Sequence, residues 1–277
     1  MTDYTQYLPK HEVHLIGKND LYIELYRGDP SATPGRKISP PLLFVHGAYT
    51  GSWMWSKYIP HFVENGWTCY ALNLRSHFKS RVMDMSRITV DDYMEDIREV
   101  LSLIAEPPVL IGFSMGGILS QKIAETADLA GLIVIDSSIS KEVHDAMPYP
   151  VTDRIESGVI MPAPIRPELE TIDESSEDIA FQRQYLQMES AQAFRTFSPL
   201  CGAEGISIDG KLIHCPSLVI KAILSEDENQ RGQLTANQLK ASYAGLWNTT
   251  HTGVLVGQRY KEVVDIMLEW LGSIDLE

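Results

Sequence analysis

The sequence contains few cysteines, no long apolar run and fewer basic than acidic residues. Its 277 residues include three cysteines, Cys69, Cys201 and Cys215, without C-x-x-C spacing, so we expect neither a disulfide framework nor a zinc site. No apolar run approaches the ~20 residues that a membrane-spanning helix needs. The 37 acidic side chains outnumber the 23 basic ones, and a formal net charge of −14 repels nucleic acids and anionic lipids. We therefore expect neither nucleic acid nor a membrane as a partner.

Two smaller absences concern location and metal ions. Residues 1–7 lack the basic start and apolar core of a signal peptide, so a cytoplasmic location is expected. His11 and His14 are close in the sequence, but residues three apart in a strand point to opposite sides of the sheet. We therefore do not expect these two histidines to share a metal ion.

A G-x-S-x-G motif, Gly112 to Gly116, stands between an apolar run at 109–111 and a helix-forming run at 118–124. By chance alone such a motif occurs in roughly one chain in ten of this length, so the prediction depends on the strand before the motif and the helix after it. A serine between a strand and a helix lies in a sharp turn, with its hydroxyl exposed and the helix amides behind it. We predict that Ser114 is a nucleophile and that the N–H of Met115 helps to bind an oxyanion.

A second apolar run, at 42–45, leads into a loop that begins with His-Gly. Such a run predicts a buried parallel strand whose carboxyl end carries an active-site loop. In proteins with this elbow, the loop supplies the second N–H of the oxyanion hole. That donor is expected to be Ala48, and Tyr49 and Trp53 in the same loop are the candidates for contact with substrate.

The alternation of strands and helices is interrupted once. Residues 1–137 and 214–277 carry apolar runs separated by helical patterns, so we expect one α/β core with mostly parallel strands. In 138–213 prolines recur around an acidic helical stretch, which predicts an inserted, mainly helical cap. Five apolar side chains of the cap either line a substrate cleft or hold the cap together. They are Phe181, Tyr185, Met188, Phe194 and Phe197.

A serine hydroxyl needs a general base, and histidine titrates in the useful range. In this fold the base follows the serine in the chain, which leaves three of the eight histidines: His144, His214 and His251. His214 precedes its strand, at the opposite edge of a parallel sheet from the strand ends that carry the chemistry. His144 stands among charged residues at the start of the cap. His251 follows the last strand and is the expected base.

Residues 46–55, HGAYTGSWMW, are similar to the H-G-A-x-x-G-x-W-x-W loop of plant methyl esterases and hydroxynitrile lyases. Residues 112–117, GFSMGG, are closer to bacterial esterases and cofactor-free haloperoxidases. The chain thus resembles the α/β-hydrolase superfamily over nearly its whole length outside the cap. The resemblance implies the α/β-hydrolase fold, with a mostly parallel sheet of about eight strands flanked by helices. It also implies a triad of Ser114, an acid and His251, with Ala48 and Met115 as oxyanion donors.

The chain departs from this family in two places, and the second concerns the acid. Residues 74–80, LRSHFKS, stand where many members have L-R-G-H-G-x-S, a loop with a structural role. The G-x-x-D turn that often precedes the catalytic acid is also absent.

Two strand ends could carry the acid. Asp136 ends the apolar run after the elbow helix, and Glu226, Asp227 and Glu228 follow the next run. Most members of the family carry the acid at the second place, and counting back from 243–245 favours Asp227. An aspartate after an apolar strand is also a common strand terminator, which is the reading that we give to Asp136. Glu226 and Glu228 stay open as alternatives.

These features favour a serine hydrolase that cleaves a carboxylic ester of a small or medium substrate through an acyl-enzyme, without a metal or cofactor. The same triad could act on a thioester, a lactone or a carbon–carbon bond. A homologue that binds a ligand without turnover is the alternative outside enzyme chemistry. The expected partner is a small ester-like molecule, and a homodimer is left open.

Overall fold

The computed structural model describes residues 2–29, 40–150 and 159–274, and its centre is an eight-stranded sheet in the order β1-β2-β4-β3-β5-β6-β9-β10. The pairs β1/β2 and β2/β4 are antiparallel, and the remaining pairs of this sheet are parallel. The predicted sheet of about eight mostly parallel strands is confirmed. The strands, in their order across the sheet, are Glu12–Ile16, Leu21–Tyr26, Cys69–Leu72, Leu42–Val45, Val109–Phe113, Gly131–Ile135, Ser217–Ile223 and Ser242–Trp247.

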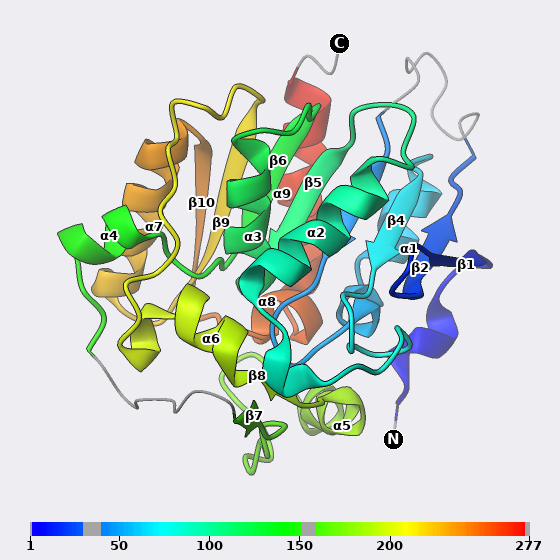
Figure 1. Ribbon diagram of the computed structural model, residues 1–277, viewed down its shortest axis with the longest axis horizontal. Helices are drawn as coiled ribbons and strands as arrows, with labels where there is room; N and C mark the ends of the chain where they lie inside the picture. The colour runs from blue at the N-terminus through cyan, green and yellow to red at the C-terminus, as the bar shows by residue number, and fades with distance from the viewer. Residues whose placement is uncertain (1, 30–39, 151–158, 275–277) are drawn as a thin grey trace.

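Helices cover both faces of the sheet (Figure 1). Successive side chains of a strand point to opposite faces, and neighbouring residues of β5 accordingly belong to different cores. Leu110 packs in the core that includes α2 and α3, whereas Ile111 packs in the core that includes α1, α8 and α9. The helices outside the cap are α1 (Ile59–Glu64), α2 (Val90–Leu101), α3 (Met115–Ala124), α7 (Glu226–Leu239), α8 (Gly253–Val256) and α9 (Tyr260–Ser273).

Helix α7 begins at Glu226, shortly after the end of β9 at Ile223. The acidic residues Glu226, Asp227 and Glu228 therefore form the first turn of a helix and not a loop. The hydroxyl of Ser225 accepts from the Glu228 N–H at 3.3 Å, and the Glu228 carboxylate accepts from the Ser225 N–H at 3.2 Å. This capping box satisfies two amide groups that the helix cannot, so Asp227 lies in the first turn of α7.

The segment 138–213, which the sequence predicts to be a cap and which we call the cap, joins β6 to β9, and its helices α5 and α6 lie along one edge of the sheet (Figure 1). The acidic stretch that was expected as one helix forms two. Leu186 leaves the helical region at ψ 136° and ends α5. The Ser190 hydroxyl then caps α6 by accepting from the Ala193 N–H at 3.1 Å. In the described part of the cap the α-helices and strands are α4 (Lys141–Ala146), β7 (Ile160–Met161), α5 (Ser176–Tyr185), β8 (Glu189–Ser190) and α6 (Ala191–Phe197), and a short 3-10 helix follows at Pro199–Cys201.

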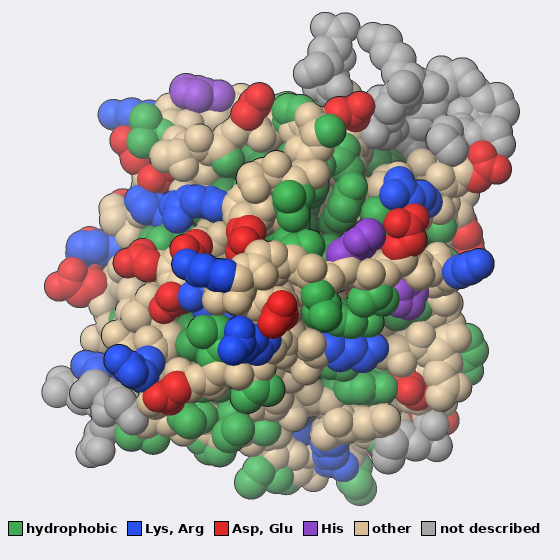
Figure 2. Space-filling view, turned by 45° about the vertical axis from the view of Figure 1, so that its right-hand side comes forward, with side chains coloured by type: hydrophobic (Ala, Val, Ile, Leu, Met, Phe, Trp, Pro, Cys, Tyr) green, Lys and Arg blue, Asp and Glu red, His purple; other side chains and the backbone are tan. Residues whose placement is uncertain are grey.

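The surface carries charges of both signs. Figure 2 shows Lys and Arg side chains interspersed with Asp and Glu on one face of the molecule, so the net negative charge does not gather there in a single patch. Among the residues that the structure describes, no helix has both the length and the apolar composition of a membrane span.

Candidate active site

Ser114 stands between β5 and α3 in a strained turn. Its backbone has φ 53° and ψ −117°, outside the regions that residues with a Cβ usually adopt. Two glycines allow the strand and the helix to meet this closely. A Cβ at Gly112 would lie 2.3 Å from the carbonyl oxygen of Gly116, and a Cβ at Gly116 would lie 2.4 Å from that of Val45. The strand–turn–helix geometry expected from G-x-S-x-G is present.

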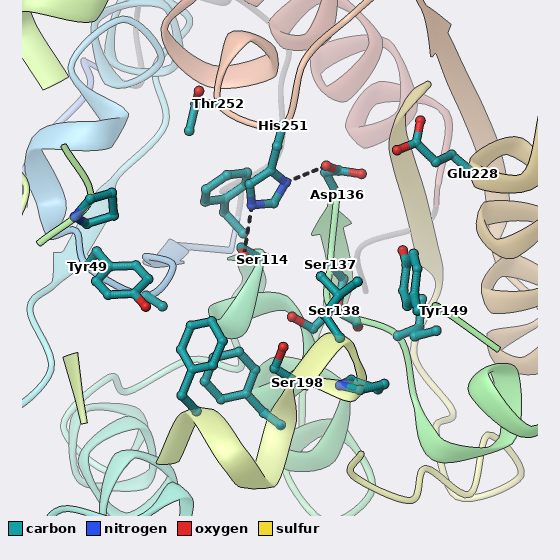
Figure 3. A pocket seen from close by; sticks show the side chains of 18 of the residues that line it. Tyr49, Ser114, Asp136, Ser137, Ser138, Tyr149, Ser198, Glu228, His251 and Thr252 are labelled. Atoms are coloured by element: carbon teal, nitrogen blue, oxygen red, sulfur yellow. Dashed lines mark hydrogen bonds and ion pairs between the residues drawn. The ribbon is translucent and has the colours of Figure 1, made fainter. Parts of the chain in front are cut away.

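His251 faces Ser114, as expected from the sequence. Its Nε2 lies 3.0 Å from Ser114 Oγ, and its Nδ1 lies 2.5 Å from a carboxylate oxygen of Asp136 (Figure 3). The ring also stacks on Phe113, with centroids 4.7 Å apart. A carboxylate only accepts, so Nδ1 carries the proton and the lone pair of Nε2 faces the serine hydroxyl.

The carboxylate on the imidazole is that of Asp136, so the expected contact between Asp227 and His251 is wrong. Asp136 follows β6, which is the neighbour of β5, and its N–H donates to Ile220 O at 2.7 Å. Asp227 lines the same cavity from the first turn of α7, but it makes no hydrogen bond to His251. Because the capping box starts α7 directly after β9, no loop is left to carry Asp227 to the imidazole.

Lys221 is a member of this cluster that sequence reasoning missed. It lies in β9, and its Nζ contacts the Asp136 oxygen that does not face His251. Both side chains are buried. Burial alone would raise the pKa of Asp136, but the Lys221 charge and the hydrogen bond with His251 lower it to about 2. The sequence did contain a signal for this contact, because a lysine inside an apolar strand is rarely buried without an anionic partner.

Ala48 and Met115 lie where oxyanion donors are expected. Met115 is the first residue of α3, so its N–H has no acceptor within the helix. Ala48 follows β3 and lines the cavity beside Ser114. Both residues therefore stand next to the hydroxyl, and their role in binding an oxyanion stays a prediction.

A buried carboxylate of the cap supports the loop after β3. Glu189 accepts from the Tyr49 N–H at 3.3 Å and from the Tyr93 hydroxyl at 2.5 Å, and it pairs with His77 at 3.0 Å. Burial alone would raise the pKa of Glu189, but the charge and hydrogen bond of His77 lower it. Tyr49 itself has φ 66°, so this contact holds the loop in an uncommon conformation.

A cavity of about 690 Å³ is lined in part by Ser114, His251 and Asp136 (Figure 3). Its apolar lining includes Phe194 and Phe197 of α6, and its polar lining includes Asp227, Glu228 and Arg231 of α7. In the described part of the chain, no group of three or more His, Cys, Asp or Glu side chains could hold a metal ion.

Tyr49 lines the cavity as expected, and of the five cap side chains with two possible roles Phe194 and Phe197 line it too, but four other candidates do not. Trp53 is buried away from the cavity and stacks on Tyr185, with centroids 5.5 Å apart. Phe181 meets Trp53 edge-on at 5.4 Å, and the side chain of Met188 is exposed. Trp53, Phe181 and Tyr185 therefore hold α5 against the core.

Comparisons with known proteins agree with this geometry. Residues 42–266 match the model of the alpha/beta hydrolase family, and no protein of curated function matches the chain significantly.

Three solved structures illustrate the shared fold. A structure from work on the carboxylesterases of Nitrososphaera gargenis is 17% identical in sequence to this chain, with a TM-score of 0.66. The match covers 94% of this chain and 98% of the other. The monoacylglycerol lipase of Paleococcus ferrophilus has 16% identity and a TM-score of 0.66, covering 91% and 98%. A soluble variant of the Saccharomyces cerevisiae monoglyceride lipase has 11% identity and a TM-score of 0.70, covering 95% of each. Since the family model spans most of the sequence, the chain belongs to the alpha/beta hydrolase family.

Proposed function

We propose that the protein is a serine hydrolase that cleaves a carboxylic ester through an acyl-enzyme. The observation that carries this proposal is the unbroken hydrogen-bonded series from Asp136 through His251 to Ser114, at the wall of a large cavity. Carboxylesterases and a monoacylglycerol lipase are among the proteins that share the fold, which agrees with an ester as the substrate. A thioesterase domain and an enol-lactonase share it too, so the choice of an ester over a thioester or a lactone is part of the proposal.

The reaction follows from the positions of these groups. His251 Nε2 takes the proton of Ser114 while Oγ attacks the ester carbonyl, and Asp136 stabilises the imidazolium. The N–H groups of Ala48 and Met115 bind the oxyanion. The tetrahedral intermediate collapses, and the alcohol leaves with the proton from Nε2. A water, deprotonated by His251, then attacks the acyl carbonyl and forms a second tetrahedral intermediate. The bond between the carbonyl carbon and Ser114 Oγ breaks, Oγ takes the proton back from Nε2, and the carboxylic acid is released.

The test combines a panel of p-nitrophenyl esters of increasing acyl length with a fluorophosphonate probe. We expect steady hydrolysis of at least part of the panel and a phosphonylated peptide that contains Ser114. A protein that hydrolyses no ester and takes no probe, although folded by thermal unfolding, would overturn the proposal.

Phe194 is expected to limit the length of the acyl group. It is half-buried in the cavity wall, with its ring 5.6 Å from that of Tyr49 and 4.8 Å from that of Phe197. Phe194→Ala should raise kcat/KM for longer esters relative to shorter ones, by about 10- to 200-fold for each added methylene that the shortened wall admits. Met188→Ala, at an exposed position, is the control. If the esters keep the same order of kcat/KM in Phe194→Ala, Phe194 does not limit the length of the acyl group.

Lys221 is expected to set the acid limb of the pH–rate profile. In Lys221→Met the charge of Asp136 acts on the imidazolium of His251 without a competing cation, so protonated His251 is favoured. The acid limb of kcat/KM should therefore move to higher pH. Lys211→Met, which removes the same charge at an exposed site, is the control. A limb that stays in place or moves to lower pH would contradict this role.

A further inference from the structure

The loop that carries His251 is held at the edge of the molecule. The His251 side chain is 51% exposed, and its ring contacts are those with Asp136, Ser114 and Phe113 described above. The neighbours of His251 on either side, Thr250 and Thr252, both form side-chain hydrogen bonds with the cap, and the Thr250 hydroxyl also accepts from the Gly253 N–H at 3.1 Å. The position of the base therefore depends on groups that are far from it in the sequence.

Asp173 of the cap holds the residue before His251. One of its carboxylate oxygens accepts from the Thr250 N–H at 3.0 Å, and the other accepts from the Thr250 hydroxyl at 2.8 Å. Its own carbonyl oxygen accepts from the Gln258 N–H at 2.7 Å. A Cβ at Gly253 would lie 2.2 Å from the Asp173 carboxylate, so only glycine permits this approach.

Glu174 holds the residue after His251. One oxygen accepts from the Thr252 hydroxyl at 2.8 Å, and the other lies 2.9 Å from the Thr250 hydroxyl. Arg166 donates to Thr252 at 2.9 Å and pairs with Glu174 at 3.1 Å, and Gln182 donates to Glu174 at 2.7 Å. Both sides of His251 are thus fixed by two adjacent carboxylates of the cap.

Burial and charge make these contacts strong. Asp173 is 3% exposed and Glu174 is 1% exposed, so water does not compete for their oxygens. Burial raises the pKa of Asp173. Burial alone would also raise the pKa of Glu174, but hydrogen bonds from Arg166, Gln182 and Thr252 lower it. An ionised carboxylate accepts shorter and stronger hydrogen bonds than a neutral group does.

We propose that Asp173 and Glu174 are positioning residues that hold His251 in line with Ser114, so that the triad is complete only when the cap is seated. This inference rests on the proposed function. A catalytic group displaced by about 1 Å can lose about 10²-fold in rate, so a loop that relaxes by this amount loses most of its turnover.

Isosteric amides test the two carboxylates. Both oxygens of each side chain accept hydrogen bonds, so Asp173→Asn and Glu174→Gln each lose one acceptor while keeping their shape. We expect kcat to fall by about 10- to 100-fold, with KM near that of the wild type. The rate of fluorophosphonate labelling should fall in parallel with kcat.

The chain offers a matched control in Asp178 of α5. This carboxylate is also 3% exposed. It accepts from Lys57 at 2.7 Å, from Tyr4 at 2.8 Å and from the Ser175 N–H at 2.9 Å, and it makes no hydrogen bond to residues 250–252. Asp178→Asn should lower the Tm to a similar extent without lowering kcat. If kcat falls equally in all three variants, in step with Tm, or stays unchanged in Asp173→Asn and Glu174→Gln, the inference is wrong.

Thr250 gives a second route if an Asp173 variant does not fold. Thr250→Val should reproduce the loss in kcat, whereas Thr250→Ser should restore most of it, because the serine keeps the hydroxyl. The double variant Thr250→Val/Asp173→Asn should lose little more than either single variant, since the two groups act as one contact. Additive losses would overturn the inference.

One readout does not depend on ester hydrolysis. If the wild-type protein is inert toward esters and probe, the proposed function fails on that result alone. Amide hydrogen exchange at Thr250 then still reports on the loop. Faster exchange in Asp173→Ala than in Asp178→Ala supports the contact, and equal exchange overturns it.

Discussion

Replacement of Asp136 with asparagine will lower kcat on the order of 10⁴-fold, because it fixes the imidazole in the wrong tautomer. Lys221 can only donate, so it will bind the amide oxygen of the new side chain. The NH₂ group then faces Nδ1 of His251, which must accept, and the ring proton moves to Nε2. In that tautomer His251 cannot take the proton of Ser114. Steady-state kinetics of the variant against p-nitrophenyl esters measure the loss.

The same change at Asp227 is the control that separates the two candidate acids. Asp227 lies in the first turn of α7 and makes no hydrogen bond to His251, so Asp227→Asn should leave kcat near that of the wild type. Because Lys221 loses its charged partner in Asp136→Asn, thermal unfolding is needed to show that this variant is folded at the assay temperature. A larger loss from Asp227→Asn than from Asp136→Asn would move the acid back to α7.

The carboxylate that contacts His251 was the part of the site that the sequence placed wrongly, and two local signals could have corrected it. Ser225 and Glu228 have the S-x-x-E spacing of a capping box, which starts a helix at once and leaves no loop for the acid. Lys221 lies in the middle of an apolar strand, where it needs a buried anion. Together these signals favour the neighbouring strand end, at Asp136, over the end of β9.

Ser114 and His251 were predictable because their placement follows from chain order and sheet geometry. A nucleophile after a parallel strand and a base after a later strand meet at the same edge of the sheet. His214 stands before β9, at the opposite edge, and was excluded on that ground. No side-chain packing had to be known for either step.

The cap was harder to predict because its packing partners lie far away in the sequence. Phe181 and Tyr185 are four residues apart and share one face of α5, which the pattern alone could assign to the cavity or to the core. In the structure this face packs on Trp53 and, through Phe181, on Tyr4 near the amino terminus. A periodic pattern indicates that a helix face is buried, but not what buries it.

Ser114→Ala will abolish fluorophosphonate labelling and lower ester hydrolysis by at least about 10³-fold. The oxygen that attacks the carbonyl is lost, whereas the oxyanion donors and the cavity remain. The fold should be unaffected, because alanine occupies the elbow with the same backbone and one atom fewer. Probe labelling followed by mass spectrometry, together with steady-state kinetics, measures both effects.

Ser198→Ala is the matched control, because Ser198 is one of the other serines that line the same cavity. Ser198→Ala should keep the label, since the imidazole of His251 faces Ser114 instead and the Ser198 hydroxyl stays a weak nucleophile. Ser114 is set apart by its hydrogen bond with His251 Nε2 at 3.0 Å and its place before the N-terminus of α3. Activation therefore depends on the position of the hydroxyl and not on its burial in the cavity. Full hydrolysis by Ser114→Ala, or a label that moves to Ser198, would place the nucleophile elsewhere in the cavity.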